Sequence, residues 1–324
     1  MNEDWELPSA LQPRQDSLDF DLGAVYRSLV QLHVEASENG YTASILGTER
    51  LGSGVVIRSA ERKLVLTIGY LITEAESIWL TTFDGKVVQA YPLAIDQASG
   101  FGLVQPLGPL EPPALERSSA ATLGIGDRVL VIGHGGARHS LEARLIARRE
   151  FAGYWEYLLD DALFTAPPHP QWGGTALIGA DGLLLGIGSL FVQEALAQES
   201  FDANMFVPVD LLEPVLEDMI ELGQPRRRPR PWLGVYTAEQ ADRVMVAGLT
   251  RDGPAHRAGL RLGDVIAEVA GQPVRSLPQL FRAVWSAGSA GARVPLTLTR
   301  GRESLHVNVR SGNRDDYLKK PSQH

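Results

Sequence analysis

The chain has 324 residues, of which 44% are hydrophobic and 21% are charged, and these proportions are ordinary for globular protein. Its formal net charge of −9 argues against nucleic acid as a partner, and the lack of cysteine excludes disulfides and thiolate chemistry. No apolar stretch approaches the roughly 20 residues that a membrane-spanning helix needs. We therefore expect two or three globular domains, without a membrane span.

The chain begins with an acidic segment, residues 1–21, that contains prolines and has no hydrophobic period. We expect it to form a flexible arm. Runs rich in Val, Ile, Leu and Thr then recur at short intervals, at 54–57, 64–67, 77–82 and 128–132. Such runs predict strands, and the pairs Asp84-Gly85 and Asp181-Gly182 are typical of tight hairpin turns. Many regularly spaced strands indicate a β-sandwich or a β-barrel.

A different pattern begins near Val209. Apolar residues recur at helical spacing over 209–222, with Asp210 placed to cap the helix and Gly223 to end it. The next residues, 224–231, read QPRRRPRP. Their prolines and charges predict a semi-extended linker, with a basic docking strip as the alternative.

A second module is expected at 232–312, before a polar tail at 313–324. It contains the run DGPAHRAGLRLGDVI at 252–266. A helix is expected over 276–285, with Ser276 as its N-cap. Four apolar residues fall on one face of this helix: Leu277, Leu280, Phe281 and Val284. Strands are expected at 294–299 and 304–309.

Three short stretches resemble the trypsin-like domain of the HtrA/Deg family. They read LTIGYL at 66–71, DQASGFGL at 96–103 and QWGGTAL at 171–177, where that family reads roughly T-x-x-H-V, D-x-x-[ST]-D-L-A-V and G-N-S-G-G-P-L. The second module resembles a PDZ domain. The resemblance implies a mainly β fold, with a trypsin-like double six-stranded β-barrel over 22–223 followed by an α+β PDZ domain.

Carried over to this chain, the catalytic histidine, aspartate and serine become Tyr70, Gly100 and Gly173. Acyl transfer by serine needs a hydroxyl, a base that takes its proton and a carboxylate that orients the base. Tyrosine, with a pKa of about 10, is a poor base at neutral pH, and glycine offers neither hydroxyl nor carboxylate. A one-residue shift would place Trp172 at the nucleophile position without changing this conclusion. The sequence therefore predicts a pseudoprotease that is not an enzyme.

Other chemistry would need other residues. A relocated hydrolase site is one alternative, with Thr175 or Ser189 as its nucleophile, and a holdase-type chaperone is another. The histidines His134, His139 and His169 raise the question of a metal site. Zinc sites use three or four ligands with a supporting second layer of contacts, and no such pattern is visible, so we expect neither metal nor cofactor.

The PDZ resemblance implies binding of protein C-termini or extended peptides. The terminal carboxylate would meet the segment 232–235 (Trp232, Leu233, Gly234 and Val235), and an apolar terminal side chain would meet Leu277, Leu280, Phe281 or Val284. We expect a scaffold, adaptor or regulatory subunit that binds protein or peptide partners, and it could form a hetero-complex with an enzyme.

The resemblance also bears on assembly and location. HtrA-type barrels assemble through their N-terminal segments, which implies a homo-oligomer with Phe20 and Tyr26 as candidate subunit contacts. The first residues, MNEDWE, lack the basic and apolar regions of a secretory signal. The sequence therefore predicts a cytoplasmic location, or a periplasmic one if an export segment has been removed.

Overall fold

The structure, a computed structural model, describes residues 5–196 and 199–319. They form two compact units. The first contains residues 5–149, most of Asp161–Arg226, and residue 319; the second contains Glu150–Asp160 and Arg227–Leu318. The second unit thus combines the C-terminal module with a short segment from the middle of the chain. No helix in the described part of the chain is both long and apolar enough to cross a membrane.

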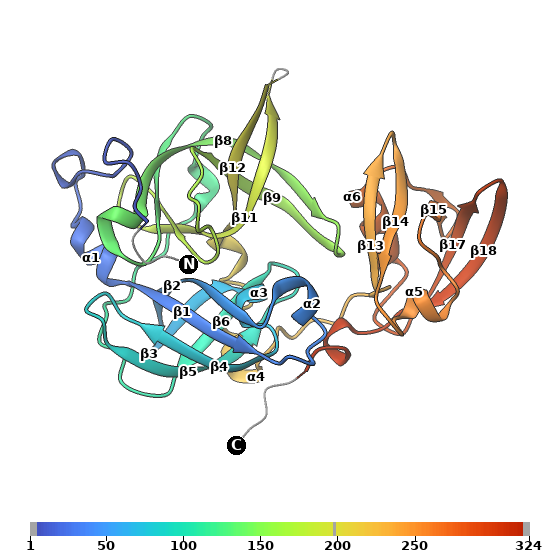
Figure 1. Cartoon of the computed structure of the whole chain (residues 1–324), viewed down its shortest axis with the longest axis horizontal. Helices are drawn as coiled ribbons and strands as arrows, with labels where there is room; N and C mark the ends of the chain where they lie inside the picture. The colour runs from blue at the N-terminus through green and yellow to red at the C-terminus, as the bar shows by residue number, and fades with distance from the viewer. Residues whose placement is uncertain (1–4, 197–198, 320–324) are drawn as a thin grey trace. The chain divides into compact units, whose positions relative to one another are not determined.

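The first unit is built on two closed six-stranded barrels (Figure 1). The first barrel has the strand order β1-β2-β3-β6-β5-β4. Its strands are β1 (Leu29–Ala36), β2 (Glu49–Ser59), β3 (Arg62–Ile68), β4 (Ala75–Thr81), β5 (Val87–Ile95) and β6 (Phe101–Pro106). Along β1 the side chains of Val30, Leu32 and Val34 are buried, whereas Gln31 and Glu35 are exposed. This alternation of period two places one face of the strand in the barrel core.

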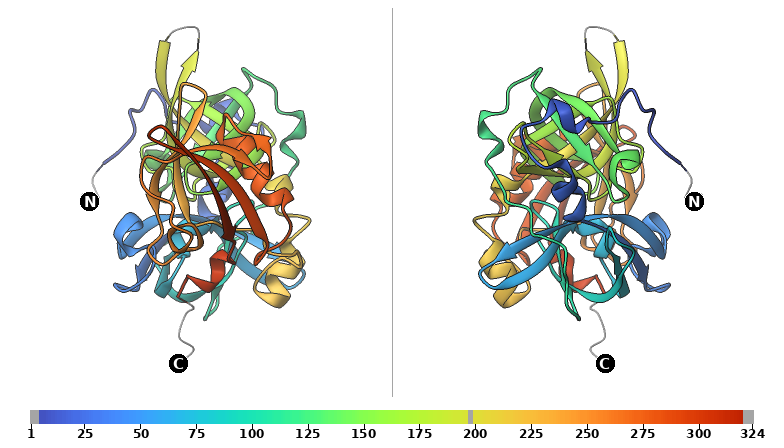
Figure 2. Two further views of the ribbon diagram at one scale, coloured as in Figure 1. Left: turned by 90° about the vertical axis from the view of Figure 1, so that its right-hand side faces the viewer. Right: turned by 90° about the vertical axis from the view of Figure 1, so that its left-hand side faces the viewer.

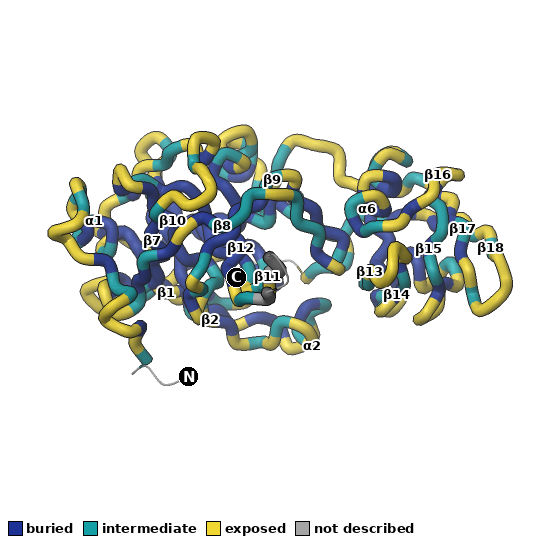
Figure 3. Tube along the Cα trace, turned by 90° about the horizontal axis from the view of Figure 1, so that it is seen from above, coloured by how far each residue is buried: buried dark blue, intermediate teal, exposed yellow. Residues whose placement is uncertain are grey.

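The second barrel repeats the arrangement, with the order β10-β11-β12-β9-β8-β7. Its strands are β7 (Arg128–Ile132), β8 (Ser140–Gly153), β9 (Tyr157–Ala166), β10 (Ala176–Ile178), β11 (Leu184–Leu196) and β12 (Glu199–Pro208). Figure 2 shows β11 and β12 continuing beyond the barrel as a two-stranded ribbon. Buried residues concentrate in the barrel strands and exposed residues in the connections (Figure 3). The predicted mainly β, double-barrel fold is confirmed.

Short helices connect the strands of this unit: α1 (Leu22–Arg27), α2 (Ala43–Leu46), α3 (Gly69–Ile72) and α4 (Leu216–Leu222), with 3-10 turns at Gln15–Ser17, Ala120–Thr122, Gly136–His139 and Val209–Leu211. The single helix expected over 209–222 is therefore divided. Pro214 lies at the division, and proline has no N–H to continue a helical ladder. Asp210 does not cap α4; its carboxylate accepts the Ala120 N–H at 2.9 Å.

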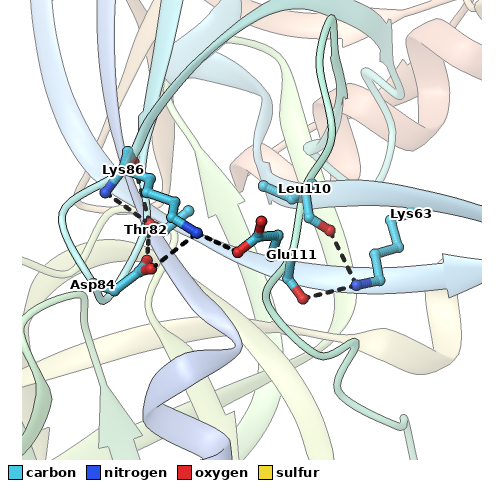
Figure 4. Close-up of polar contacts among 6 residues, drawn as sticks. All are labelled: Lys63, Thr82, Asp84, Lys86, Leu110 and Glu111. Carbon is cyan, nitrogen blue, oxygen red and sulfur yellow. Dashed lines mark hydrogen bonds and ion pairs between the residues drawn. The ribbon is translucent and has the colours of Figure 1, made fainter.

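The hairpin that joins β4 to β5 turns at Asp84-Gly85, as expected from that pair. Thr82 holds both sides of the turn, because its hydroxyl donates to the Asp84 carboxylate and accepts the Lys86 N–H (Figure 4). The Lys86 ammonium pairs with Glu111, which lies in the connection between the barrels. Lys63 donates to the carbonyl of Leu110 at 3.0 Å on the same connection (Figure 4). These contacts fasten the connection to the first barrel.

The N-terminal segment packs on the second barrel, contrary to the flexible arm expected there. The Leu7 side chain is 6% exposed and lies in the apolar core of that barrel, and its N–H donates to the Arg138 carbonyl at 2.9 Å. The Trp5 ring stacks on His139 at 4.3 Å. Burial of Trp5 and Leu7 outweighs the acidic composition that suggested an arm; residues 1–4 lie outside the described residues.

The two aromatic residues proposed for subunit contacts pack within their own chain. The Phe20 ring lies so close to Gly182 that a Cβ on this glycine would be 2.5 Å from it. Tyr26 is half-buried beside Gly136. Assembly into a homo-oligomer remains a prediction, and the packing of Phe20 and Tyr26 within their own chain does not support it.

The second unit contains one antiparallel sheet of order β13-β14-β15-β17-β18, with β16 paired to β15. Its elements are β13 (Val235–Gln240), β14 (Arg243–Leu249), α5 (Pro254–Arg257), β15 (Val265–Val269), β16 (Gln272–Pro273), α6 (Leu277–Ser286), β17 (Arg293–Arg300), β18 (Glu303–Arg310) and a 3-10 turn at Arg314–Asp316. Ser276 caps α6 by accepting the Gln279 N–H at 3.4 Å. Strand β13 is an edge of this sheet, next to the segment expected to bind carboxylates.

Candidate functional site

The three positions matched to a catalytic triad lie together in the first unit. Tyr70 belongs to α3 and Gly173 to the loop before β10. A Cβ on Gly173 would lie 2.8 Å from the Tyr70 hydroxyl. Gly69, the neighbour of Tyr70, donates its N–H to the Gly100 carbonyl at 2.7 Å. The fold therefore brings together positions whose side chains supply no hydroxyl at residue 173 and no carboxylate at residue 100.

The Tyr70 phenol is held as a hydrogen-bond donor. Its hydroxyl donates to the Ser189 carbonyl at 3.0 Å, and burial raises its pKa above the ordinary value. A phenol with a raised pKa stays protonated at neutral pH and does not accept a proton from a nucleophile. Tyr70 is thus a neutral group next to Gly173.

The backbone around Gly173 is fixed by contacts with both barrels. The Gly173 carbonyl accepts the Ser53 N–H from β2 at 2.9 Å, and Gly174 donates its N–H to Gly188 in β11 at 2.9 Å. Gly174 has φ of +77°, and a Cβ there would lie 1.8 Å from the Ser53 carbonyl oxygen. Only glycine fits this close approach of two chain segments.

The carboxylate of the second stretch belongs to Asp96, and its hydrogen bonds stabilise the turn that follows it. Asp96 is 2% exposed and accepts the Ser99 hydroxyl at 2.6 Å, the Ser99 N–H at 3.1 Å and the Ala98 N–H at 3.1 Å. This pattern is an Asx-type turn that shapes the approach to β6. Asp96 therefore stabilises the loop that carries Gly100.

The candidate relocated nucleophiles differ in their contacts. Thr175 is fully buried, and its hydroxyl donates to the Trp172 carbonyl at 3.0 Å. Ser189 is 4% exposed, and its carbonyl receives the Tyr70 hydroxyl. Trp172 is half-buried, with its ring 5.5 Å from that of Phe191. These contacts place Thr175 and Ser189 beside the positions matched to the catalytic triad.

His169 is a buried structural residue. Its Nε2 lies 3.0 Å from the His139 carbonyl oxygen, and its Nδ1 accepts the Gln171 N–H at 3.1 Å, which fits the tautomer protonated at Nε2. Burial lowers the pKa of His169 to about 4, so the ring is neutral at pH 7. Within residues 5–196 and 199–319 there is no group of three or more His, Cys, Asp or Glu side chains that could hold a metal.

The second unit contains a carboxylate held by backbone amides. Leu233, Gly234 and Val235 all donate their N–H groups to the Glu156 side chain, at 3.0, 2.7 and 3.1 Å. Gly234 has φ of +73°, which lets successive amides turn toward one point. Trp232 is placed differently, because its N–H donates to the Gly312 carbonyl at 3.1 Å and its ring packs on Tyr317.

The four helix residues expected to contact a terminal side chain all lie in the apolar core of this unit. Leu277 is 8%, Leu280 0%, Phe281 1% and Val284 2% exposed. The same cluster contains Leu158, which is 7% exposed. Sequence reasoning missed Glu156 and Leu158; the concentration of aromatic residues in the turn sequence FAGYWEY at 151–157 was the one available signal.

Comparison with known proteins supports the two-domain organisation. Residues 52–187 match the family described as trypsin-like peptidase domain, and residues 231–310 match the family described as PDZ domain. The periplasmic serine endoprotease DegP of Escherichia coli (strain K12) is 24% identical over 274 residues, which cover 80% of this chain and 56% of DegP. A probable DegP-like periplasmic serine endoprotease of Halomonas elongata is 28% identical over 292 residues, which cover 83% and 58%.

Solved structures agree on the fold. The HtrA-type protease AlgW with a tripeptide superposes with a TM-score of 0.54 at 21% identity, over 96% of this chain and 99% of that one. The serine endoprotease from Yersinia pestis gives a TM-score of 0.53 at 22% identity, over 91% and 98%. The chain is thus a trypsin-like domain followed by a PDZ domain, and the matches support the resemblance to HtrA/DegP-type serine proteases.

The names of these relatives contradict two predictions made from the sequence. DegP and its relatives are serine endoproteases, which contradicts the prediction that the chain is not an enzyme. They are also periplasmic, which contradicts the cytoplasmic location. The first prediction rested on three side chains alone, and the second on the composition of six residues, which does not determine a compartment.

Proposed function

We propose that this protein binds peptides through its PDZ domain. The supporting observation is the convergence of three successive backbone N–H groups, from Leu233, Gly234 and Val235, on one carboxylate. A C-terminal peptide carboxylate is the same chemical group. Hydrogen bonds from several amides to an ionised acceptor are stronger than neutral ones, so this loop is suited to a chain terminus.

Strand β13 supplies the second requirement for peptide recognition. It is an edge of its sheet, and a peptide can add to a sheet edge as a further strand by bonding to the outward N–H and C=O groups of the edge strand. In β13 the N–H groups of Val235 and Thr237 bond to Glu156 and Tyr154, so a peptide would have to replace these contacts. A bound peptide would extend along β13 with its last carboxylate at residues 233–235. The role that fits such binding is that of an adaptor which holds protein C-termini or extended peptides.

A direct binding measurement tests this proposal. The probe is a fluorescein-labelled peptide FAGYWL, which has an apolar C-terminal residue and a free carboxyl group. Fluorescence anisotropy with the full chain should show saturable binding, and amidation of the C-terminus should weaken it at least tenfold because the amide removes the charge. Binding that ignores amidation would contradict carboxylate recognition by the loop.

The second candidate function is peptide-bond hydrolysis, which the names of the relatives favour. Hydrolysis of the Ser-His-Asp type is not available from Tyr70, Gly100 and Gly173, since none of these side chains supplies the required group. We propose that any proteolysis by this chain uses another nucleophile, and Thr175 and Ser189 are the nearest hydroxyl residues.

Casein cleavage by the purified protein, followed by mass spectrometry, tests this second candidate. Activity that Thr175→Ala or Ser189→Ala abolishes while the protein remains folded would assign the nucleophile. Activity unchanged in both variants would exclude them.

We also propose a periplasmic location, which the names of the relatives support. Accessibility of the protein to external protease in spheroplasts would test it.

A further inference from the structure

The PDZ unit includes a segment from the middle of the chain. Strands β8 and β9 are neighbours in the second barrel, yet the tip of their hairpin, Glu150–Asp160, forms one compact unit with Arg227–Leu318. This tip supplies the Glu156 carboxylate that the loop amides hold. The occupant of the carboxylate site is therefore a side chain of the same protein.

One backbone hydrogen bond joins the tip to β13, because the Thr237 N–H donates to the Tyr154 carbonyl at 3.0 Å. Two residues earlier on β13, the Val235 N–H donates to the side chain of Glu156, which lies two residues later in the tip. The two segments of the chain therefore run in opposite directions at this point, as β13 and an antiparallel peptide would, although residues 154–156 form a turn. The tip presents a side-chain carboxylate where a bound peptide would present its terminal one.

An apolar side chain accompanies the carboxylate. Leu158 is 7% exposed and belongs to the cluster that contains Leu277, Leu280, Phe281 and Val284. These four are the residues expected to meet a terminal apolar side chain. The hairpin tip therefore supplies both groups by which a PDZ domain recognises a C-terminus.

Two further features indicate that contacts with the PDZ domain hold the tip in a backbone conformation that its own residues disfavour. Glu156 has φ of +61°, a left-handed conformation that is unfavourable for a residue with a side chain. Arg282 of α6 forms ion pairs with Glu150 and Asp160, one on each side of the tip. The docking contacts maintain a backbone conformation that a free turn would seldom adopt.

We propose that the β8–β9 tip is the resident ligand of the peptide site formed by residues 233–235, β13 and α6, and that an external C-terminus binds only by displacing Glu156 and Leu158. The inference rests on the proposed peptide binding, and it identifies the tip as the segment that regulates that binding. A tethered ligand acts at the high effective concentration set by its short connection. The apparent affinity for an external peptide equals the intrinsic affinity multiplied by the fraction of molecules whose site is free of the tip.

The decisive experiment compares Glu156→Ala with the wild-type full chain, using the free-carboxyl peptide FAGYWL. We expect Glu156→Ala to bind this peptide at least tenfold more tightly. The matched control is Glu142→Ala, which removes a glutamate of β8 that pairs with Arg128 away from the tip; its affinity should equal that of wild type. If Glu156→Ala does not fold, Glu156→Gln replaces it, with a smaller gain expected.

A second measurement needs no peptide. Hydrogen exchange followed by mass spectrometry should show the amides of 233–237 protected in the wild type and exchanging at least tenfold faster in Glu156→Ala. Equal exchange in the two proteins would overturn the inference. If wild type and Glu156→Ala bound the free-carboxyl peptide equally and amidation still weakened binding, the resident-ligand inference would be overturned. The proposed peptide binding would remain supported. Absence of carboxylate-dependent binding in every variant would instead count against the proposed function.

Discussion

The cluster of Tyr70, Gly100 and Gly173 and the loop at 233–235 differ in what their chemistry needs. In the cluster, chemistry of the protease type requires particular side-chain groups, and a neutral phenol and two glycines stand in their places. In the loop, the proposed recognition would use backbone N–H groups, which every residue except proline has. A backbone site therefore depends on conformation, and a catalytic site depends on residue identity.

The largest expected effect on stability concerns the close approach of Gly174 to β2. Gly174→Ala would place a Cβ 1.8 Å from the Ser53 carbonyl oxygen at φ of +77°. Left-handed strain and overpacking together predict a loss of about 4 kcal/mol in the free energy of unfolding. Urea denaturation measures it.

Gly85→Ala is the matched control for that substitution. Gly85 also has positive φ, +81°, but a Cβ there would meet no atom within 4 Å. Only the strain remains, so the loss should be about 1 kcal/mol. Equal losses in the two variants would show that the close approach of Gly174 to Ser53 in β2 does not restrict residue 174 to glycine.

Sequence patterns predicted the parts of the fold that local chemistry determines. The runs of Val, Ile, Leu and Thr, the Asp84-Gly85 turn and the Ser276 cap are local signals, and all appear as expected. The division at Pro214 was missed because apolar spacing was given more weight than the missing proline N–H. Burial of Leu7 was missed because its partners in the second barrel are more than 100 residues distant.

The next prediction concerns the conformation of the carboxylate loop. Gly234→Val would force a β-branched residue to φ of +73°, with its Cβ 3.0 Å from the Trp232 ring and 3.1 Å from Thr250. We expect a loss of about 3 kcal/mol in stability and at least tenfold weaker binding of the FAGYWL peptide, measured by denaturation and anisotropy.

Gly271→Val controls for the strain alone. Gly271 has φ of +77° and open space around its Cβ position, and it lies in the β15–β16 turn. It should lose stability but keep peptide affinity. Equal losses of affinity in both variants would show that the loop conformation at Gly234 is not what recognises the peptide.

A smaller effect is expected from restoring the nucleophile position. In Gly173→Ser the new Cβ would lie 2.8 Å from the Tyr70 hydroxyl and would disturb its bond to Ser189. We expect a loss of about 2 kcal/mol, and no rise in fluorophosphonate labelling above the wild-type level, because Tyr70 remains a poor base.

The Tyr70→Phe background identifies the cause of that loss. Removing the phenol hydroxyl gives room to the introduced serine side chain, so the cost of Gly173→Ser should fall by about 1 kcal/mol in a double-mutant cycle. An unchanged cost would contradict a direct clash. A rise in labelling would contradict the assignment of Tyr70 as the residue that leaves this serine unactivated.

Of the carboxylate site, only the residues that belong to one continuous sequence motif could be predicted. Leu233, Gly234 and Val235 were identified from their own sequence motif. Glu156 was not, because it lies 77 residues from Leu233 and a single glutamate in a turn has no distinguishing pattern. Its role arises from the fold, which carries the β8–β9 tip to the amides.

The smallest expected effect is a pH dependence of the resident ligand. Burial raises the pKa of Glu156 from 4.5 to about 7, although the three N–H bonds and the Arg314 charge act in the opposite direction. The docked tip therefore binds more protons than a free tip. Docking is fully favourable below about pH 4.5 and weakens as pH rises through about 7.

External peptide should consequently bind more readily at higher pH. Between pH 6 and pH 8 the linkage predicts about a tenfold gain in apparent affinity for FAGYWL. The peptide's own carboxylate also titrates in the site, so the quantity to measure is the ratio of wild-type to Glu156→Gln affinity, in which that contribution cancels. Glutamine keeps the shape and the acceptor oxygen but does not ionise. A ratio that is constant across this range would show that Glu156 does not titrate while bound to the amides of 233–235, whereas a ratio that falls with pH would reverse the sign of the proposed coupling.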